Sequence, residues 1–314
     1  MFHILLVIIY ITFISLGLPD SLLGATWPSM YSALNVPISY AGIISIIITL
    51  GTIISSLFSV QLIRKIGTGW IIAISVGMTA TALFGFSISG SFIYLCLWAI
   101  PYGLGAGSVD AALNNFVALH YKAKHMNWLH SFWGVGATLG PYIMGLSLTG
   151  NLGWQHGYRV ISLMQITLTL ILLLSLPMWK KSHDHKEDKK DITPLLTYKQ
   201  LIRLPYAKHT LIAFFCYSSI ETGTGLWGSS YMVLNKGISP MDAASYMALF
   251  YLGITIGRFA SGLLTIKLQT KHMIRLGLCL ITLGIVIIFF STSSISILIG
   301  LILIGLGCAP IFPS

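Results

Sequence analysis

The chain has 314 residues, of which 55% are hydrophobic and only 8% are charged. Soluble domains are about 25% charged, so this composition excludes an ordinary soluble protein and indicates a protein embedded in a membrane. The net charge of +10 does not indicate a nucleic-acid partner, because basic loops beside a bilayer account for it.

Ten apolar stretches are long enough to cross a bilayer as helices, which takes about 20 residues each. We expect these spans at 4–30, 38–60, 70–88, 92–118, 128–148, 157–179, 209–232, 241–264, 273–292 and 295–314. Helix breakers such as Pro37 and Gly90 mark the short links between them. The sequence therefore predicts an all-α, multi-pass membrane protein.

Lysine and arginine residues gather on one side of the predicted bundle. Fifteen of the eighteen lie in or beside the links that follow spans two, four, six and eight. Arg159 and Lys236 lie on the opposite side, and Arg258 lies inside a span. Because basic loops stay in the cytoplasm, we expect a cytoplasmic N-terminus and a cytoplasmic linker at 180–208. We interpret the run His183–His185 in this linker as solvated loop rather than as a metal site.

The stretches before and after this linker resemble each other. Leu50–Lys65 aligns with Leu252–Lys267, and Gly103–Gly105 aligns with Gly305–Gly307, both at an offset of about 202 residues. Repeats that share one orientation are related by an axis along the membrane normal and are typical of secondary transporters. We therefore expect two pseudo-symmetric halves.

The first span contains Asp20, and a carboxylate that faced lipid there would be costly. Pro19 removes a backbone donor, and Gly17 and Gly24 let the helix bend or a ligand approach. A buried carboxyl group that gains and loses a proton is what a proton-coupled carrier needs. We predict that Asp20 couples to protons; a carboxylate hydrogen-bonded only for structure is the alternative.

The fourth span carries Gly103, Gly107, Asp110 and Asn114 on one helical stripe. The cost of a lipid-facing carboxylate puts this stripe against protein or water, so Asp110 is a second proton-coupling candidate. Asn114 lies one turn away and is a candidate for binding a solute hydroxyl or Asp110. Asn115 points elsewhere and is a weaker candidate for the same role. We assign a structural role to the two glycines.

After the linker, Glu221 begins a glycine-rich run that is typical of the broken helices of transporter sites, so it is the third proton-coupling candidate. Its alternative is a buried structural pair. Arg258 is assigned a structural role, either snorkelling to the interface or pairing with an acid. Pro141 is expected to permit a kink in span five.

Four further side chains are candidates for the solute. Trp27 and Trp227 follow the acids of spans one and seven by about two turns and could stack on a sugar ring, with an interfacial aromatic belt as the alternative. His130 could relay protons, and Gln165 could line the pathway. No phosphate-binding loop, zinc spacing or triad signature is present, so we predict no enzyme activity, no cofactor and no metal.

Four motifs make the chain resemble the major facilitator superfamily and, within it, the fucose–proton symporter family of sugar permeases. They are Gly17–Asp20, Asp110–Asn115, His130–Gly134 with Gly140–Pro141, and Gly307–Pro313. The resemblance implies a helical bundle of twelve spans, of which about ten are present, so the chain would be C-terminally truncated. It also implies proton and sugar coupling shared by Asp20 and Asp110. The domains expected from it are a six-helix bundle at 1–179, the linker at 180–208 and an incomplete bundle of four helices at 209–314.

We therefore expect a secondary transporter that moves a small polar solute, a monosaccharide by resemblance, in symport with protons by alternating access. One alternative is a proton-coupled drug or metabolite exporter, because Gly136–Pro141 resembles an antiporter motif. The other is a non-transporting sensor or an inert fragment. The expected partners are the solute, protons and the lipid bilayer, with no nucleic acid, for a monomer in the cell membrane.

Overall fold

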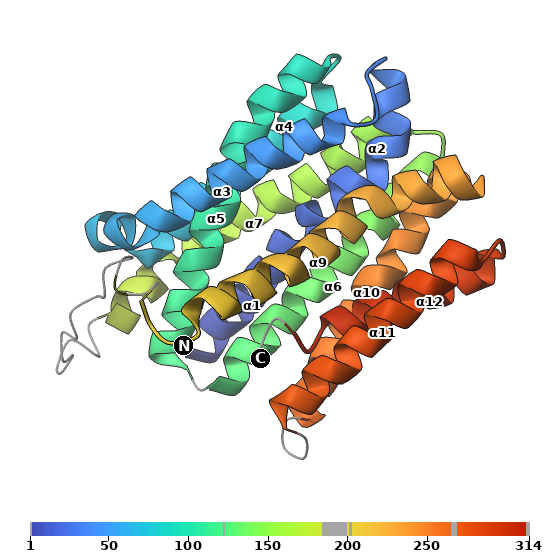
Figure 1. Ribbon diagram of the computed structural model, residues 1–314. Helices are drawn as coiled ribbons and strands as arrows, with labels where there is room; N and C mark the ends of the chain where they lie inside the picture. The colour runs from blue at the N-terminus through green and yellow to red at the C-terminus, as the bar shows by residue number, and fades with distance from the viewer. Residues whose placement is uncertain (1, 122, 184–199, 201–202, 265–268, 312–314) are drawn as a thin grey trace.

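The computed structural model describes residues 2–121, 123–183, 200, 203–264 and 269–311. Within these residues the chain forms eleven helices and no strand, arranged as one bundle of long, tilted helices (Figure 1). The helices are α1 (Phe2–Asp20), α2 (Leu22–Ala33), α3 (Tyr40–Ile66), α4 (Thr68–Ile88), α5 (Phe92–His120), α6 (Ala123–Thr149), α7 (Gly153–His183), α9 (Ala207–Lys236), α10 (Pro240–Leu264), α11 (Thr270–Phe290) and α12 (Ser294–Cys308). The prediction of an all-α bundle is confirmed.

Each of the ten predicted spans falls on a helix, but the first is broken. α1 ends at Asp20 and α2 begins at Leu22, with Ser21 between them. Pro19 explains the break, because it has no backbone N–H to donate to the preceding turn. The break leaves the Asp20 side chain at a helix end in the middle of the bundle.

Seven of the spans, counting α1 with α2 as one, are long and apolar enough to cross a membrane by length and composition. The other three are α6, α9 and α12. α6 and α9 have 27 and 30 residues but carry more polar side chains, and α12 has 15 residues. The polar residues of α6 and α9 include Trp133 and Glu221, which line the cavity described below.

The linker predicted at 180–208 lies mostly outside the described residues. α7 extends to His183, so the start of the predicted linker is helical, and α9 begins at Ala207. Residues 184–199 and 201–202 are not described. The interpretation of His183–His185 as a solvated loop therefore concerns side chains that the structure does not describe.

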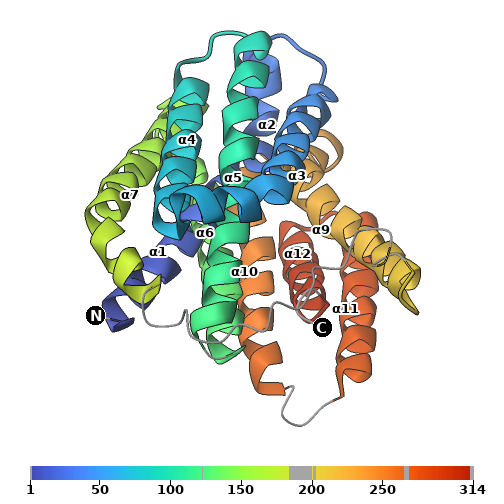
Figure 2. The same ribbon diagram turned by 90° about the vertical axis from the view of Figure 1, so that its left-hand side faces the viewer.

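The helices before the linker meet those after it along one main seam. α6 and α10 lie side by side over much of their length, as Figure 2 shows at the centre of the bundle. A second contact joins α2 to α9. α12 packs on α10 and α11, whereas α11 touches little besides α12.

The glycine stripe of α5 packs against α3. A Cβ atom at Gly103 or Gly107 would collide with the backbone of Ile48 or Thr52. Thr52 Oγ1 donates to the Gly103 carbonyl at 3.2 Å, and Ser56 Oγ donates to the Gly107 carbonyl at 3.2 Å. We expected this stripe to face protein or water, and at Gly103 and Gly107 it faces protein. Both glycines allow close packing of the two helices.

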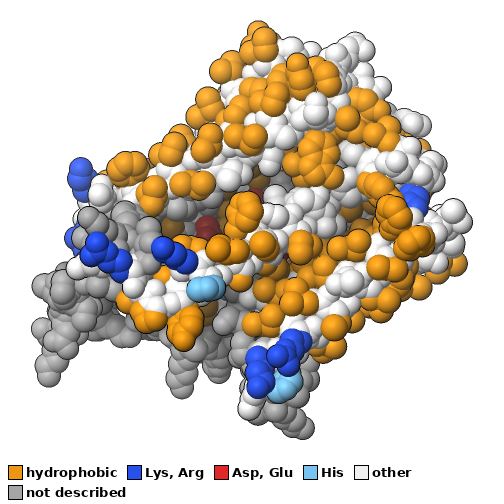
Figure 3. Space-filling model, viewed as in Figure 1, with side chains coloured by type: hydrophobic (Ala, Val, Ile, Leu, Met, Phe, Trp, Pro, Cys, Tyr) orange, Lys and Arg blue, Asp and Glu red, His pale blue; other side chains and the backbone are white. Residues whose placement is uncertain are grey.

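The outer surface is apolar along the length of the helices. Leu57, Phe58 and Leu174 have 52%, 53% and 82% of their surface exposed. Hydrophobic side chains cover the face drawn in Figure 3, and the visible Lys and Arg side chains gather toward the ends of the bundle. An apolar surface of this extent fits a bilayer rather than water.

Lys236 ties the end of α9 to the end of α11. Its Nζ donates to the carbonyls of Phe289 and Ser291 at 3.0 and 2.7 Å. A cation is favourable at a helix C-terminus, where carbonyls lack helical partners. We expect Lys236→Met to reduce the free energy of unfolding by about 1 kcal/mol, seen as a lower melting temperature in detergent. The control is Lys208→Met at an exposed position, which should have the melting temperature of wild type. Equal melting temperatures of the two variants would show that the Lys236 hydrogen bonds do not stabilise the protein.

Candidate functional site

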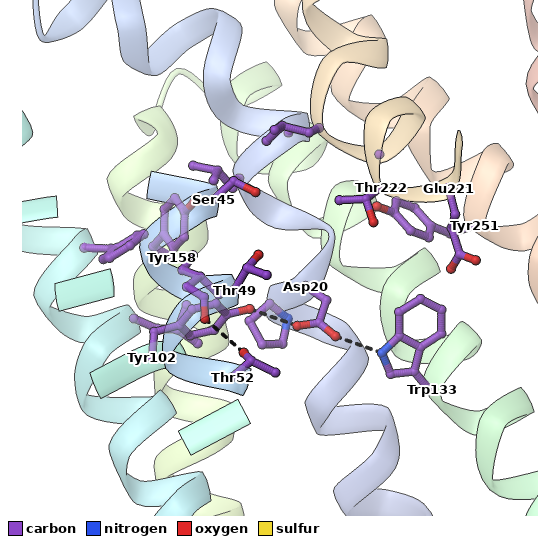
Figure 4. Close-up of a pocket in the computed structure, with 18 residues that line it drawn as sticks. Asp20, Ser45, Thr49, Thr52, Tyr102, Trp133, Tyr158, Glu221, Thr222 and Tyr251 are labelled. Atoms are coloured by element: carbon purple, nitrogen blue, oxygen red, sulfur yellow. Dashed lines mark hydrogen bonds between the residues drawn. The ribbon is translucent and has the colours of Figure 1, made fainter. Parts of the chain in front are cut away.

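A cavity of about 360 Å³ lies beside the break between α1 and α2. Its walls come from helices on both sides of the linker, and Figure 4 draws its lining residues and labels ten of them. Acidic atoms are visible deep in the hollow between α3 and α9 in Figure 3. The polar and aromatic lining residues are Asp20, Ser45, Thr49, Thr52, Tyr102, Trp133, Tyr158, Glu221, Thr222 and Tyr251.

Asp20 is held by two donors from other helices. Tyr102 OH on α5 donates to Oδ1 at 3.0 Å, and Trp133 Nε1 on α6 donates to Oδ2 at 2.9 Å. The side chain is exposed to the cavity although helices surround it (Figure 4). A carboxyl group in this position can exchange a proton or a hydrogen-bonded solute without leaving the protein interior.

Glu221 lies on α9, on the other side of the cavity. Its Oε1 is 3.6 Å from Arg258 Nη2, and its Oε2 accepts a hydrogen bond from Tyr217 OH. Arg258 is buried, so of the two arrangements that we considered for it, the structure shows pairing with an acid rather than snorkelling. The pair balances the charge of Glu221, whereas neither donor to Asp20 carries a positive charge.

Asp110 lies outside the lining of this cavity. Asn114 Nδ2 donates to its Oδ1 at 3.0 Å, one helical turn along α5. Of the three predicted proton-coupling acids, Asp20 and Glu221 line one cavity. Asn115 is exposed on another face of α5.

Two predicted solute-binding residues have structural surroundings. Trp27 is fully buried, and its Nε1 donates to the Ile38 carbonyl at 2.6 Å. Gln165 is buried as well; its Nε2 donates to the Ser15 carbonyl at 2.6 Å and its Oε1 accepts from Thr79 Oγ1. Both polar groups are occupied by the protein, so neither faces the cavity.

His130 and Trp227 also lie away from the cavity. The His130 ring lies edge-on to Phe13, with centroids 5.9 Å apart, and its carbonyl accepts from Arg258 Nη1 at 3.3 Å. Trp227 is 36% exposed and lines a separate apolar groove between α9 and α11. In the described residues, none of the six predicted solute-binding side chains lines the cavity that holds Asp20.

Apart from Asp20 and Glu221, the polar side chains that line the cavity were missed, except that Trp133 belongs to one of the four motifs. Ser45, Thr49 and Thr52 stand at i, i+4 and i+7 on α3, which places them on one face of a mostly apolar helix. That spacing is a signal in the sequence. Tyr158 and Tyr251 have no comparable signal, because only the fold brings α7 and α10 to the cavity.

One end of the cavity is closed where α2 crosses α9. A Cβ atom at Gly24 would collide with the Gly225 carbonyl, so the two backbones touch. Ser229 Oγ donates to the Ala25 carbonyl at 3.3 Å beside this crossing. The closure joins a helix before the linker to a helix after it.

Comparison with known proteins gives one family. A family model described as Major Facilitator Superfamily matches residues 9–314. The glucose/mannose transporter GlcP of Bacillus subtilis is 24% identical over 317 residues, which cover 97% of this chain and 77% of that protein. The cis,cis-muconate transport protein of Acinetobacter baylyi is 21% identical over 294 residues, 90% of this chain and 71% of that protein. A crystal structure of a variant of the nucleoside transporter NupG matches with a TM-score of 0.75 and 14% identity, over 97% of this chain and 79% of that one.

Proposed function

The chain belongs to the Major Facilitator Superfamily of membrane transporters, and we propose that it moves a monosaccharide across the cell membrane in symport with a proton. The observation that carries this proposal is the position of Asp20: a carboxylate at a helix break, open to a central cavity and held by neutral donors. An ionisable group inside a membrane protein is a functional candidate by default.

The cavity has the chemistry of a site for a polyhydroxylated ring. Its volume of about 360 Å³ is within the range of small-molecule sites, about 300–1,000 Å³. The hydroxyls of α3 and the Asp20 carboxylate can bond to sugar hydroxyls, and the Tyr251 ring offers an apolar face. Asp20 and Glu221 both line the cavity and only Glu221 is paired with a guanidinium, which disfavours an anionic solute such as a dicarboxylate.

The proton would act on the hydrogen bonds of Asp20. While Asp20 is charged, the bonds from Tyr102 and Trp133 are charge-assisted and strong. When Asp20 takes up a proton, both bonds weaken and the Tyr102 hydroxyl becomes available to the solute. A state with proton and solute bound then differs in charge and contacts from the empty state, as symport requires.

Alternating access would follow from movement of α1–α7 against α9–α12. The α2–α9 crossing closes one end of the cavity, and the distribution of Lys and Arg among the links supports an outer position for that end, with the N-terminus in the cytoplasm. The structure would then be closed to the outside. Opening at this crossing and closing at the opposite end would expose Asp20 to the outside.

The exporter alternative has no specific observation in its favour. A Cβ atom at Gly136 would collide with the Ile14 carbonyl, so close packing of α6 on α1 explains the glycine of the antiporter-like motif. The experiment is uptake into proteoliposomes of glucose, mannose, a nucleoside, muconate and an apolar drug, with and without an imposed pH gradient. Gradient-driven uptake of a monosaccharide supports the proposal; drug efflux or muconate uptake without sugar uptake would refute it.

Thr49 is expected to bind the solute directly. It lines the cavity, and no hydrogen bond of its hydroxyl is found within the described residues. Thr49→Val keeps the shape and removes the hydroxyl, so the loss of one hydrogen bond of about 1 kcal/mol should weaken glucose binding about fivefold. Isothermal titration in detergent measures this. Thr81→Val, whose exposed hydroxyl bonds only to the Gly77 carbonyl, is the control and should bind glucose normally; unchanged binding in Thr49→Val would remove this hydroxyl from the site.

A further inference from the structure

A continuous series of contacts joins the two carboxylates of the cavity. Trp133 Nε1 donates to Asp20 Oδ2 at 2.9 Å. The Arg258 guanidinium lies over the Trp133 ring, 4.9 Å from its centroid, and Arg258 Nη2 lies 3.6 Å from Glu221 Oε1. In Figure 4 the indole lies beside Asp20 with its nitrogen toward the carboxylate. The series runs from α1 through α6 and α10 to α9.

Arg258 occupies an unusual place for a cation. It is 7% exposed, inside a helix that is long and apolar enough to span a membrane. It contacts α6 twice, through the Trp133 ring and through the His130 carbonyl at 3.3 Å from Nη1. A buried ion pair is weak evidence for stability, because the attraction between the charges is largely offset by their loss of hydration. Stability alone therefore gives no strong reason for a guanidinium on the α6–α10 seam.

We propose that Trp133 and Arg258 are positioning residues that transmit the charge state of Asp20 to Glu221, so that proton binding and the α6–α10 seam change together. This inference rests on the proposed proton-coupled function. It assigns to Trp133 and Arg258 a role in coupling rather than in holding the solute.

The physical basis is the geometry of the indole. A charged Asp20 holds Trp133 by its N–H and so fixes the ring face under Arg258. A cation–π contact depends on the cation staying over the face of the ring. When Asp20 is neutral, the bond to Nε1 weakens, the ring is free to turn, and Arg258 loses its contact with the ring face. Arg258 and Glu221 can then move together with α10 and α9.

Several groups besides Trp133 face Asp20 and bear on its proton. Tyr102 of α5 donates to Oδ1, Glu221 of α9 lines the same cavity, and Asp110 lies on α5 outside the lining. Tyr251 of α10 lies edge-on to Trp133, with ring centroids 6.4 Å apart. None of these groups joins Asp20 to Arg258 directly, so the indole is the connection that the test must break.

The test uses Trp133→Phe, which keeps a weaker ring face and removes the N–H, and Arg258→Lys, which keeps the charge and removes the planar group. The chain is reconstituted in proteoliposomes, and radiolabelled glucose is followed in gradient-driven uptake and in exchange between equal pH values. We expect each variant to lose about tenfold in driven uptake, within the usual range of coupling between sites, and to keep most of its exchange. The double variant should be no worse than either single one, because both act in one series.

Two exposed positions give matched controls. Trp70→Phe on α4 and Arg64→Lys on α3 make the same chemical changes away from the seam and should transport like wild type. Equal losses of exchange and driven uptake in Trp133→Phe would show a role in solute binding or folding and overturn the inference. Additive losses in the double variant would overturn it as well.

A distance measurement that needs no transport tests this inference separately from the proposed function. Spin labels at Ser32→Cys and Asn235→Cys, in a background without native cysteines, report the distance between the outer ends of α2 and α9 as pH changes. In wild type the distance should change with pH, and in Trp133→Phe it should not. A pH response retained in Trp133→Phe, or absent from wild type, overturns the coupling even if no sugar is transported. Absence of sugar uptake with the pH response intact and dependent on Trp133 would instead refute the proposed substrate.

Arg258→Gln alone leaves Glu221 with an unbalanced charge and is expected to fold poorly. The charge-neutral double variant Arg258→Gln with Glu221→Gln removes both charges, so it should melt close to wild type. It should nevertheless lose the pH-dependent distance change. A double variant that melts normally and still responds to pH would overturn the inference.

Discussion

Replacing Asp20 by asparagine is expected to lower gradient-driven glucose uptake by about a hundredfold or more, the range for removing a positioned proton-transfer group. Asparagine resembles the neutral acid in shape and still accepts hydrogen bonds through its amide oxygen. It cannot release a proton, so the cycle of charged and neutral Asp20 stops. Exchange of glucose at equal pH should continue in part, since it needs the solute site but no net proton movement.

The measurement is glucose uptake and proton current after a pH jump, in proteoliposomes with matched protein content. Asp242→Asn is the matched control, because Asp242 is an acid in the first turn of α10 whose carboxylate bonds to Ser239 outside the cavity. This variant should transport normally. Unchanged currents in Asp20→Asn would refute proton coupling through Asp20, and loss of driven uptake and exchange alike would make Asp20 a solute ligand instead.

Asp20 could be selected from the sequence because its surroundings are local. The apolar residues that make a charge at Asp20 costly and the neighbouring Pro19 all lie within a few residues of it. The break between α1 and α2 follows from that proline. Its partners could not be selected in this way. Tyr102 and Trp133 are 82 and 113 residues away in sequence, and only helix packing brings them to the carboxylate.

The position of Trp27 along α2 explains why it is not beside Asp20 in the cavity. We placed it there by counting two helical turns from Asp20. Gly24, one turn after Asp20, lines the cavity, but it is also where α2 meets Gly225 of α9, and Trp27 lies beyond this crossing. Trp27 therefore packs in the core and bonds to the Ile38 carbonyl, where it fixes the link to α3.

For Asp110 the sequence predicted a face of the helix but not what covers it. The glycine half of the stripe packs on α3 at Ile48 and Thr52, so its glycines serve a helix contact. A small-residue stripe in a membrane helix fits both a packing seam and a pathway. The hydroxyl face of α3 was the more useful pattern, since Thr49 and Thr52 are unusual in a helix whose other residues are mostly apolar.

The second large effect is expected at the α2–α9 crossing, where Gly24 meets Gly225. A Cβ atom at Gly24 would overlap the Gly225 carbonyl and backbone, which cannot turn aside as a side chain can. Overpacking of this kind costs about 1–3 kcal/mol, and it falls only on the state in which this end of the cavity is closed. A penalty of that size lowers the population of the closed state about 5- to 150-fold.

Gly24→Ala should therefore slow glucose uptake by a similar factor and lengthen the distance between labels at Ser32 and Asn235. The control is Gly223→Ala on α9, where a Cβ atom would meet nothing within 4 Å, so uptake and distance should match wild type. Both variants make the same change in a membrane helix, and any difference between them comes from the crossing. If Gly24→Ala transported normally at the wild-type distance, the α2–α9 contact would not be the closure of the cavity. A longer distance with normal uptake would mean instead that closure at this end is not the step that limits transport.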